Sequence, residues 1–222
     1  MAVDDIIEAE IMSTALAIFV KTPSLSPLKT RLAAGIGKEK AEEFYIHSLK
    51  AIEKTVKQTH AKVFWAVGEQ EGLNNPLWRA FETIYTGEGG LGERQHYIYN
   101  HLLSNHDRVI LIGADAPQLS PCILERSIEA LNTHDFVLGP ANDGGYYLFG
   151  GRIPVNRHIW SAVPWSTKQT RQTLEGLLSS KPCHLEPLTD VDTQNDLQQL
   201  KTEMPEAMSD EQQNLLDWVS SL

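Results

Sequence analysis

Residues 109–119 of the chain read V-I-L-I-G-A-D-A-P-Q-L. Residues 108–112 form a mostly apolar run of strand length, which is typical of a central strand covered on both faces in a parallel sheet. Asp115 follows this predicted strand, and ligands of open α/β sheets bind outside the carboxyl ends of the strands. Asp115 is therefore a candidate ligand of a metal or substrate, although Asp115 and Pro117 are also ordinary turn residues.

The segments before this strand repeat a strand-helix order. Apolar runs of strand length occur at residues 15–21 and 62–67, and residues 38–58 between them carry apolar side chains at helical spacing. Strand, helix, strand is the unit that builds a parallel sheet. We expect residues 22–27 to form a loop that leads to the K-T-R-L sequence of residues 29–32.

Shorter elements continue the pattern toward the C-terminus. We expect strands at residues 83–85, 136–139, 146–149 and 184–188, and helices at 76–81, 91–103, 120–131, 209–220 and between 168 and 178. Thr193 is predicted to cap a further helix, with Asp196 as its capping-box partner, which leaves Asp190 and Asp192 without a capping role. The predicted fold class is thus α/β, with a mostly parallel central sheet and helices on both faces.

Length and composition limit the classes of protein to consider. With 222 residues and 41% hydrophobic content, residues 14–222 can form a single domain with a substantial core, whereas the acidic residues 1–13 are predicted to be a flexible extension. The net charge of -10 disfavours binding to polymeric nucleic acid but permits a small phosphorylated ligand. Cys122 and Cys183 indicate neither a zinc site nor a disulfide and are predicted to be small core residues. No segment has the length of a membrane span, so we expect a cytoplasmic protein.

Two further segments carry groups suited to a phosphate ligand. Lys29 and Arg31 are expected near the carboxyl end of the first strand, where Arg binds phosphate bidentately and Lys acts as a point charge. The alternative is a solvated basic turn. Asp143 precedes Gly144 and Gly145 in a loop whose backbone could pass close to a ligand, or which forms only a tight turn.

Several familiar catalytic patterns are missing from the sequence. The histidines show no H-x-x-x-H spacing, and G-x-S-x-G does not occur, which disfavours hydrolase triads. Neither the P-loop sequence nor G-x-G-x-x-G follows the first strand, which argues against P-loop NTPases and dehydrogenases.

Seven short motifs together resemble a bacterial family of glycosyltransferase-like proteins, labelled nucleotide-diphospho-sugar transferases or radical-SAM/selenodomain-associated transferases. The motifs are K-T-P at 21–23, K-T-R-L at 29–32, L-G-E-R at 91–94, I-G-A-D-A-P at 112–117, G-P-A at 139–141, D-G-G-Y at 143–146 and P-W-S-T at 164–167. The resemblance covers residues 14–200. More distantly, the chain is similar to 2-phospho-lactate guanylyltransferase and the molybdopterin guanylyltransferases, which share a K-T-R-L-like loop, a D-x-P turn and a D-x-D-T segment.

The resemblance implies a GT-A-type, Rossmann-like nucleotide-binding fold with Mg²⁺ or Mn²⁺ on the nucleotide phosphates. Asp115 and Asp192 would bind the cation, with Asp190 as the alternative second ligand. The catalytic residues would be Lys29, Arg31 and Asp143, and the nucleotide would contact Lys21, Thr30, Gly92, Arg94, Gly144 and Gly145. The chain departs from the family at residues 25–26, where Leu-Ser replaces the usual Pro-Gly, and this change bears on how closely the backbone approaches a phosphate.

Three functions are compatible with these residues. We favour a metal-dependent transferase that takes a nucleotide-diphospho-sugar as donor and a small acceptor. The alternative is a nucleotidyltransferase that joins a nucleoside monophosphate to a phosphorylated acceptor and releases pyrophosphate. The K-T-R-L sequence favours this alternative, because a cation beside the α-phosphate assists the breaking of a bond at that phosphate. The third is a non-catalytic nucleotide-binding protein, in which the amphipathic C-terminal helix could serve a partner or a homodimer.

Overall fold

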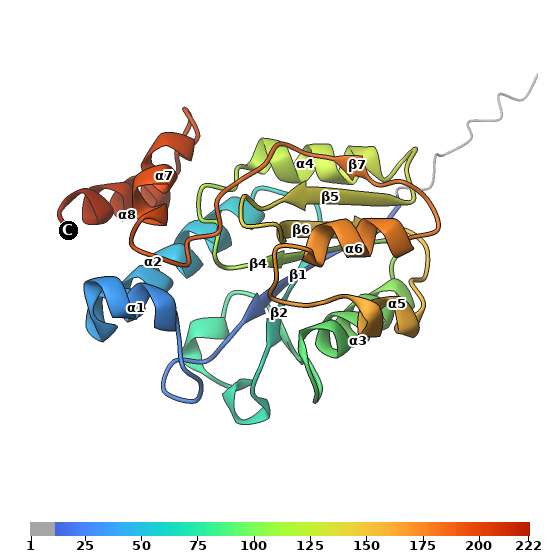
Figure 1. Ribbon diagram of the computed structural model, residues 1–222, viewed down its shortest axis with the longest axis horizontal. Helices are drawn as coiled ribbons and strands as arrows, with labels where there is room; N and C mark the ends of the chain where they lie inside the picture. Colours follow the sequence, from blue (N-terminus) through green and yellow to red (C-terminus); the bar gives the residue numbers. More distant parts are fainter. Residues whose placement is uncertain (1–11) are drawn as a thin grey trace, which may run out of the picture.

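The computed structural model describes residues 12–222 and confirms the predicted α/β class. Seven strands form one sheet in the order β3-β2-β1-β4-β6-β5-β7 (Figure 1). Every strand pair is parallel except the two made by β6, which runs antiparallel to both β4 and β5. The strands are β1 Thr14–Val20, β2 Lys62–Val67, β3 Glu82–Tyr85, β4 Arg108–Gly113, β5 Phe136–Pro140, β6 Tyr146–Gly151 and β7 Cys183–His184.

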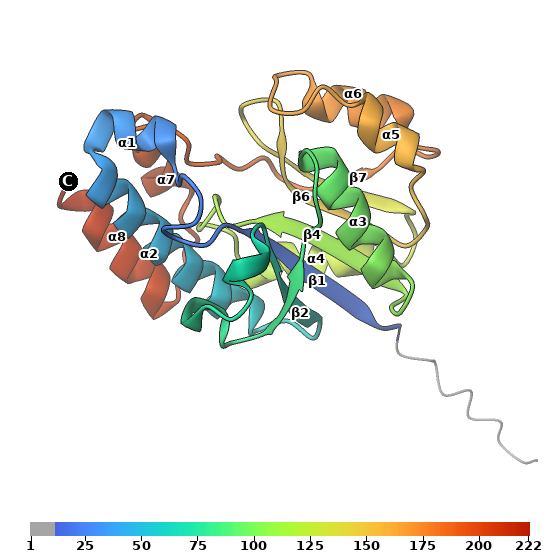
Figure 2. The same ribbon diagram turned by 90° about the horizontal axis from the view of Figure 1, so that it is seen from below.

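Helices cover both faces of this sheet, as predicted. Helices α2 and α4 pack on one face, and α3, α5 and α6 pack on the other (Figure 2). The α-helices are α1 Thr30–Ile36, α2 Lys38–Val56, α3 Leu91–Leu103, α4 Pro121–Ala130, α5 Arg157–Ala162, α6 Thr170–Leu177, α7 Asp196–Glu203 and α8 Asp210–Ser220. Two short 3-10 helices, η1 Gln70–Gly72 and η2 Pro76–Trp78, lie between β2 and β3.

The apolar runs of the central strands are explained by burial on both faces. In β1, Leu16 and Ile18 pack toward α2 and α4, whereas Ala15 and Ala17 pack toward α3. All four side chains are fully buried. A strand that is covered on both sides loses the polar alternation of a half-exposed strand, so its sequence is a continuous apolar run.

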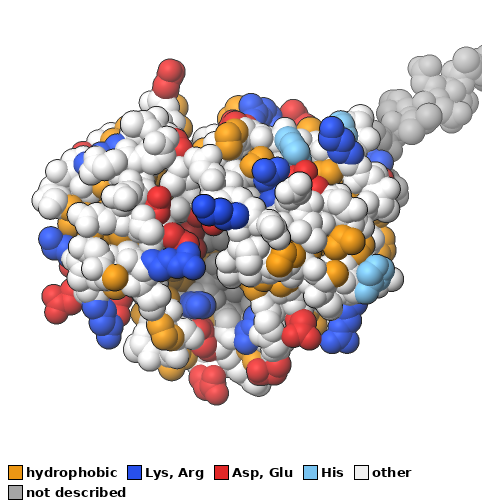
Figure 3. Space-filling model, in the orientation of Figure 1, with side chains coloured by type: hydrophobic (Ala, Val, Ile, Leu, Met, Phe, Trp, Pro, Cys, Tyr) orange, Lys and Arg blue, Asp and Glu red, His pale blue; other side chains and the backbone are white. Residues whose placement is uncertain are grey.

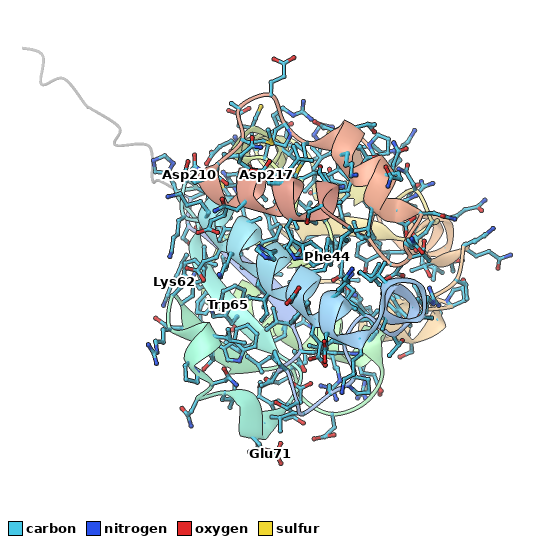
Figure 4. All side chains as sticks on the ribbon, turned by 90° about the vertical axis from the view of Figure 1, so that its left-hand side faces the viewer. Phe44, Lys62, Trp65, Glu71, Asp210 and Asp217 are labelled. Atoms are coloured by element: carbon cyan, nitrogen blue, oxygen red, sulfur yellow. The ribbon has the colours of Figure 1, made fainter. Side chains whose placement is uncertain are left out.

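The C-terminal helices form a third layer over α2. Residues of α7 and α8 pack with α1 and α2 in a separate apolar cluster that includes Phe44 and Leu215. Figure 4 shows α2 and α8 side by side, with Phe44 on α2 and with Asp210 and Asp217 on α8. The apolar face of α8 is therefore covered within the chain.

Two α-helices were not predicted. The K-T-R-L sequence begins α1 instead of lying in a loop. Lys29 is the N-cap residue of this helix; its backbone is left-handed, and its side chain makes no capping hydrogen bond. No acidic residue occupies the first turn of α1, so the usual helix-start signal is missing. Helix α5 has only six residues, too few for a recognisable period, although Asn156 caps it by accepting a hydrogen bond from the His158 N–H.

Three other predictions need correction. The helix expected after Thr193 begins at Asp196, because the Asp196 carboxylate accepts hydrogen bonds from the N–H groups of both Asp192 and Thr193 and holds them in a turn. The expected strand at 184–188 is reduced to β7 and one isolated bridge at Leu188. Cys122 is exposed in the first turn of α4 and is not a core residue, and both cysteines are free thiols.

At the N-terminal end, Ser13 is tied to Asp107. The Ser13 N–H and hydroxyl donate to the Asp107 carboxylate at 2.7 and 2.9 Å. Residues 1–11 of the predicted extension lie outside the described residues. Within residues 12–222, no helix combines the length and the apolar character needed to cross a bilayer.

Candidate functional site

A cleft with a volume of about 790 Å³ opens at the carboxyl ends of β1, β2 and β4. Figure 3 shows this hollow in the centre of the molecular face, with acidic and basic side chains at its rim. One side of the cleft is formed by the segment between β1 and α1 and by the loops after β2 and β3. The other side is formed by the start of β6 and by residues 165–167 and 170. The parallel strands thus direct several loops to one edge of the sheet, as in other open α/β folds.

Lys29 lies between the two carboxylates predicted to bind a cation. Its Nζ is 2.8 Å from Oδ1 of Asp115 and 3.9 Å from Oδ1 of Asp192, and it donates to the Val191 carbonyl at 2.5 Å. The Lys29 side chain is only 4% exposed, and its backbone is left-handed with φ 44°. Such a conformation costs a residue other than glycine about 1–2 kcal/mol, and it often occurs at functional sites. An internal ammonium group therefore occupies the space between Asp115 and Asp192.

Arg31 reaches the same acidic group from the solvent side. Its Nη1 lies 3.2 Å from Oδ2 of Asp192, and 68% of its side chain is exposed. A pair this exposed contributes little to stability because solvent screens it. Arg31 is thus free to exchange Asp192 for an anionic ligand.

The acidic residues of the cleft repel one another. Burial, and then the charge of Asp115, raise the pKa of Asp190 to about 8, while Lys29 opposes this shift. Burial also raises the pKa of Asp192, against the effect of Lys29. Asp143 also lines the cleft and raises both of these pKa values further. Lys29 and Arg31 both lower the pKa of Asp192 and so offset part of the repulsion among these carboxylates.

Arg94 anchors the glycine-rich turn on the other edge of the cleft. Its Nη1 donates to the Gly68 carbonyl at 2.8 Å and to the Thr86 hydroxyl at 2.6 Å, and its Nε donates to the Gly89 carbonyl at 3.0 Å. These bonds join the loops after β2 and β3 to the start of α3. A guanidinium held in this way is a preorganised cation beside the cleft.

Two other lining residues were not recognised from the sequence. The Tyr45 hydroxyl of α2 accepts from the Lys21 N–H at 2.9 Å and donates to the Lys21 carbonyl at 2.8 Å. Glu69 accepts from the Thr22 N–H at 2.8 Å. Both fix the backbone that leaves β1. Tyr45 had only the helical spacing of a core residue, so the sequence held no signal for this contact.

The far side of the cleft is an aromatic wall, formed by Tyr146, Trp165, Ser166, Thr167 and Thr170. The rings of Tyr146 and Trp165 meet edge to face with centroids 6.3 Å apart. The Tyr146 hydroxyl donates to Oε1 of Gln95 at 2.5 Å, and Gln95 is a third lining residue that the sequence did not indicate.

Most residues predicted for the site meet in this cleft. The lining includes Lys21, Lys29, Thr30, Arg31, Arg94, Asp115, Asp143, Gly145 and Asp192. Gly92 and Gly144 are not in the lining, and packing explains both. A Cβ at Gly92 would overlap the Trp165 indole, and Gly144 combines φ 96° with close contact to the Lys168 backbone.

The donor set of the cleft suits a hard divalent cation only in part. Carboxylate oxygens are the protein ligands that Mg²⁺ and Mn²⁺ prefer, and Asp115 and Asp192 already share a cation in the form of Lys29. Among residues 12–222, no three His, Cys, Asp or Glu side chains are close enough to enclose a metal ion. A cation at this site would therefore take most of its ligands from water and from a phosphate.

Comparison with solved structures shows the same fold in other proteins. A candidate nucleotide-diphospho-sugar transferase from Desulfovibrio desulfuricans G20 has 25% identity and a TM-score of 0.83, with 95% of this chain and 98% of that chain covered. CMP:2-keto-3-deoxy-manno-octonic acid synthetase complexed with CTP has 14% identity and a TM-score of 0.51, covering 86% and 98%. The manganese complex of Rv0371c from Mycobacterium tuberculosis H37Rv has 12% identity and a TM-score of 0.50, covering 85% and 97%. At these low identities, the last two show the fold alone.

Sequence comparison identifies the family. No curated protein matches the chain. Residues 51–167 match the family described as "Uncharacterized protein conserved in bacteria (DUF2064)". This match spans more than half of the 222 residues and includes β4, Asp115 and the aromatic wall up to Thr167. The chain therefore belongs to the DUF2064 family of bacterial proteins.

Proposed function

We propose that the protein is a metal-dependent transferase that uses a nucleotide-diphospho-sugar as donor and passes the sugar to a small acceptor. The observation that carries this proposal is the group formed by Lys29, Asp115 and Asp192 at the floor of the cleft. A buried ammonium group between two carboxylates, with Arg31 at the rim, is suited to a ligand that brings both negative charge and a cation. The name of the similar Desulfovibrio desulfuricans protein supports the same reaction class.

Mg²⁺ or Mn²⁺ held by Asp115 and Asp192 would supply electrostatic stabilisation of the phosphate charge. The nucleotide would occupy the side that carries Arg94, whose guanidinium is held against the loops after β2 and β3. Lys29 and Arg31 would neutralise phosphate oxygens as the bond to the leaving group breaks. Preorganised cations cost little reorganisation at that moment, which is the source of their catalytic effect.

The rival is a nucleotidyltransferase that releases pyrophosphate, and one observation favours it. Lys29 lies deep in the cleft, where a buried cation could stabilise charge at an α-phosphate as well as at a leaving diphosphate. The fold shared with the CTP-bound synthetase is compatible with either reaction.

A thermal-shift panel separates these functions. Nucleoside triphosphates and nucleotide-diphospho-sugars are each tested with and without Mg²⁺ or Mn²⁺. A ligand at about a hundred times its Kd adds roughly 2.7 kcal/mol to the free energy of unfolding, which a melting curve resolves. Stabilisation by nucleotide-diphospho-sugars supports the proposed donor, and stabilisation by triphosphates alone supports the rival. No stabilisation by any of them would contradict nucleotide transfer altogether, whereas binding without turnover would indicate a non-catalytic nucleotide-binding protein.

A further inference from the structure

None of the cations of the cleft belongs to the aromatic wall. The lining contains four: Lys21 and Lys29 precede α1, Arg31 lies in α1, and Arg94 lies in α3, with its guanidinium held by Gly68, Thr86 and Gly89. The aromatic wall contributes no cation, and the adjoining loop adds the carboxylate of Asp143. A phosphate or carboxylate placed against this wall would meet an acidic residue and no basic partner.

The basic residues that follow the wall in sequence do not change this distribution. Lys168 and Arg171 are both outside the lining. Arg171 is also engaged elsewhere, since its Nη1 lies 2.9 Å from Oε1 of Glu175. The wall is thus a neutral surface of rings and hydroxyl groups.

The wall is also held rigidly. Trp165 stacks on Trp160 with centroids 6.1 Å apart and an interplanar angle of 10°. Its Nε1 donates to the Trp160 carbonyl at 2.8 Å, and Gly92 of α3 packs against the indole where any larger residue would overlap it. An aromatic ring fixed in this way offers a flat apolar surface without a large entropic cost on binding.

The hydroxyl groups around the rings add directional contacts. The Thr167 and Thr170 hydroxyls donate to the Pro164 carbonyl at 2.8 Å. Thr167 Oγ1 also accepts from the Gln169 N–H, and Thr170 Oγ1 from the Thr167 N–H, which leaves each oxygen one lone pair as an acceptor. Ser166 is exposed in the lining and has a left-handed backbone with φ 60°. A flat apolar ring beside hydroxyl groups matches a sugar or cyclic polyol, whose C–H face is apolar and whose edge donates and accepts hydrogen bonds.

We infer that the aromatic wall binds an uncharged, hydroxylated ring in the part of the substrate that lies beyond the phosphates. The inference rests on the proposed function and narrows it, because it selects neutral sugars or polyols over uronic acids and sugar phosphates at this position. Selection would come from the missing cation and from Asp143, which penalise an extra negative charge.

Saturation-transfer difference NMR on the full chain tests this selection, in the presence of Mg²⁺ and the nucleotide that stabilises the protein most. The probes are the methyl glycosides of glucose, galactose and mannose and myo-inositol, each compared with glucuronate and glucose 6-phosphate. We expect saturation of ring C–H protons in at least one neutral probe, and at least about fivefold weaker binding of the anionic probes. Equal or tighter binding of an anionic probe, or no binding of any neutral ring, would overturn the inference. Nucleotide binding is measured separately, so its absence would count against the proposed function instead.

Two variants connect the result to the wall. Trp165→Leu should remove the signal of the neutral ring while nucleotide binding persists, provided that its melting curve stays cooperative. Ser166→Lys adds a cation at an exposed position of the wall and should shift the preference toward glucuronate by about tenfold. Ser161→Lys on α5 makes the same change of charge at an exposed residue outside the cleft and should leave the preference unchanged. If Ser166→Lys behaves like Ser161→Lys, the wall does not set the preference.

Discussion

Glu203 and Thr189 are joined by two hydrogen bonds: the Glu203 carboxylate accepts from the Thr189 N–H at 2.7 Å and from its hydroxyl at 2.8 Å. The same carboxylate accepts from Nε2 of Gln118 at 2.9 Å and from Nδ2 of Asn142 at 3.3 Å. These three partners lie in the loops after β4, β5 and β7, which carry four of the acidic residues of the cleft, namely Asp115, Asp143, Asp190 and Asp192. One side chain of α7 therefore ties together the segments that present the acidic residues.

Replacing Glu203 should loosen these loops together. Glu203→Gln replaces one acceptor oxygen by an NH₂ group, which faces the donor groups of Thr189, Gln118 and Asn142 and cannot accept from them. A hydrogen bond to a charged group contributes about 1.5–3 kcal/mol to stability. We expect the free energy of unfolding in urea to fall by about 2 kcal/mol, with a parallel loss of nucleotide affinity. Glu206→Gln, at an exposed residue of the next loop, is the matched control. If Glu203→Gln and Glu206→Gln have the same midpoint of unfolding in urea, Glu203 does not hold the loops after β4, β5 and β7 together.

Lys29 should compete with a divalent cation in the absence of nucleotide. Its ammonium group lies between Asp115 and Asp192, so Lys29→Met frees both carboxylates. We expect Mn²⁺ to bind the nucleotide-free variant about tenfold more tightly, a change of about 1.4 kcal/mol in isothermal titration. Nucleotide affinity should fall in the same variant because a phosphate partner is lost. Arg31→Met, at a mostly exposed side chain, should change Mn²⁺ affinity less, and a larger effect of Arg31 would contradict the assignment.

Asp115 should be required for metal-dependent nucleotide binding. Asp115→Asn keeps the shape of the side chain and removes its charge, so a folded protein is expected. Titration with nucleotide in the presence of Mg²⁺ should show the loss of the metal-dependent part of the affinity. Asp210→Asn, at the start of α8 and outside the lining of the cleft, removes the same charge and is the control (Figure 4). Unchanged nucleotide and metal affinity in Asp115→Asn would make Asp115 a turn residue only.

The contact between α2 and α8 should weaken in mild acid. His47 packs on Trp218 with ring centroids 5.5 Å apart, and burial and then Lys50 lower the pKa of His47, against the opposite effects of Glu43 and Glu211. A folded pKa below the unfolded value of about 6.5 means that the unfolded chain binds more protons, so stability falls as the pH drops through this range.

Melting curves at about pH 5 and about pH 7.5 test this effect of His47. His47→Gln cannot be protonated and should lose less stability than the original chain on acidification. His158→Gln, at an exposed position of α5, should lose as much stability on acidification as the original chain. A pH dependence that is equal in all three proteins would exclude His47 as its source.

The sequence predicted those parts of the site that follow directly from a strand. The apolar run of β4 predicted both the central position of this strand and the place of Asp115. A strand that is buried on both faces needs apolar side chains at nearly every position, so its sequence is easy to recognise. Asp143 was predicted differently, from the glycines that follow it in the loop before β6. Their meeting in one cleft follows from the direction of the strands.

Contacts made across the chain could not be predicted in this way. Tyr45, Gln95 and Glu203 reach the site from helices in which their spacing indicated only a core or a solvated face. Helix α1 escaped prediction because its start depends on the left-handed conformation of Lys29, which the tertiary contacts of the ammonium group support. Local propensity carries no information about such long-range partners.

The antiparallel direction of β6 also bears on the order in which the protein folds. Pairing of Pro140 with Tyr146 closes a short hairpin, whereas the bond from Lys29 to the Val191 carbonyl joins residues separated by 162 positions. Loop-closure entropy and contact order both favour the local pairing, so we expect the β5-β6 hairpin to be protected first in pulsed hydrogen exchange. Asp143 and Tyr146 would then be in place before Lys29 docks, and a folding intermediate would hold these two residues of the cleft without the contact of Lys29 to Val191.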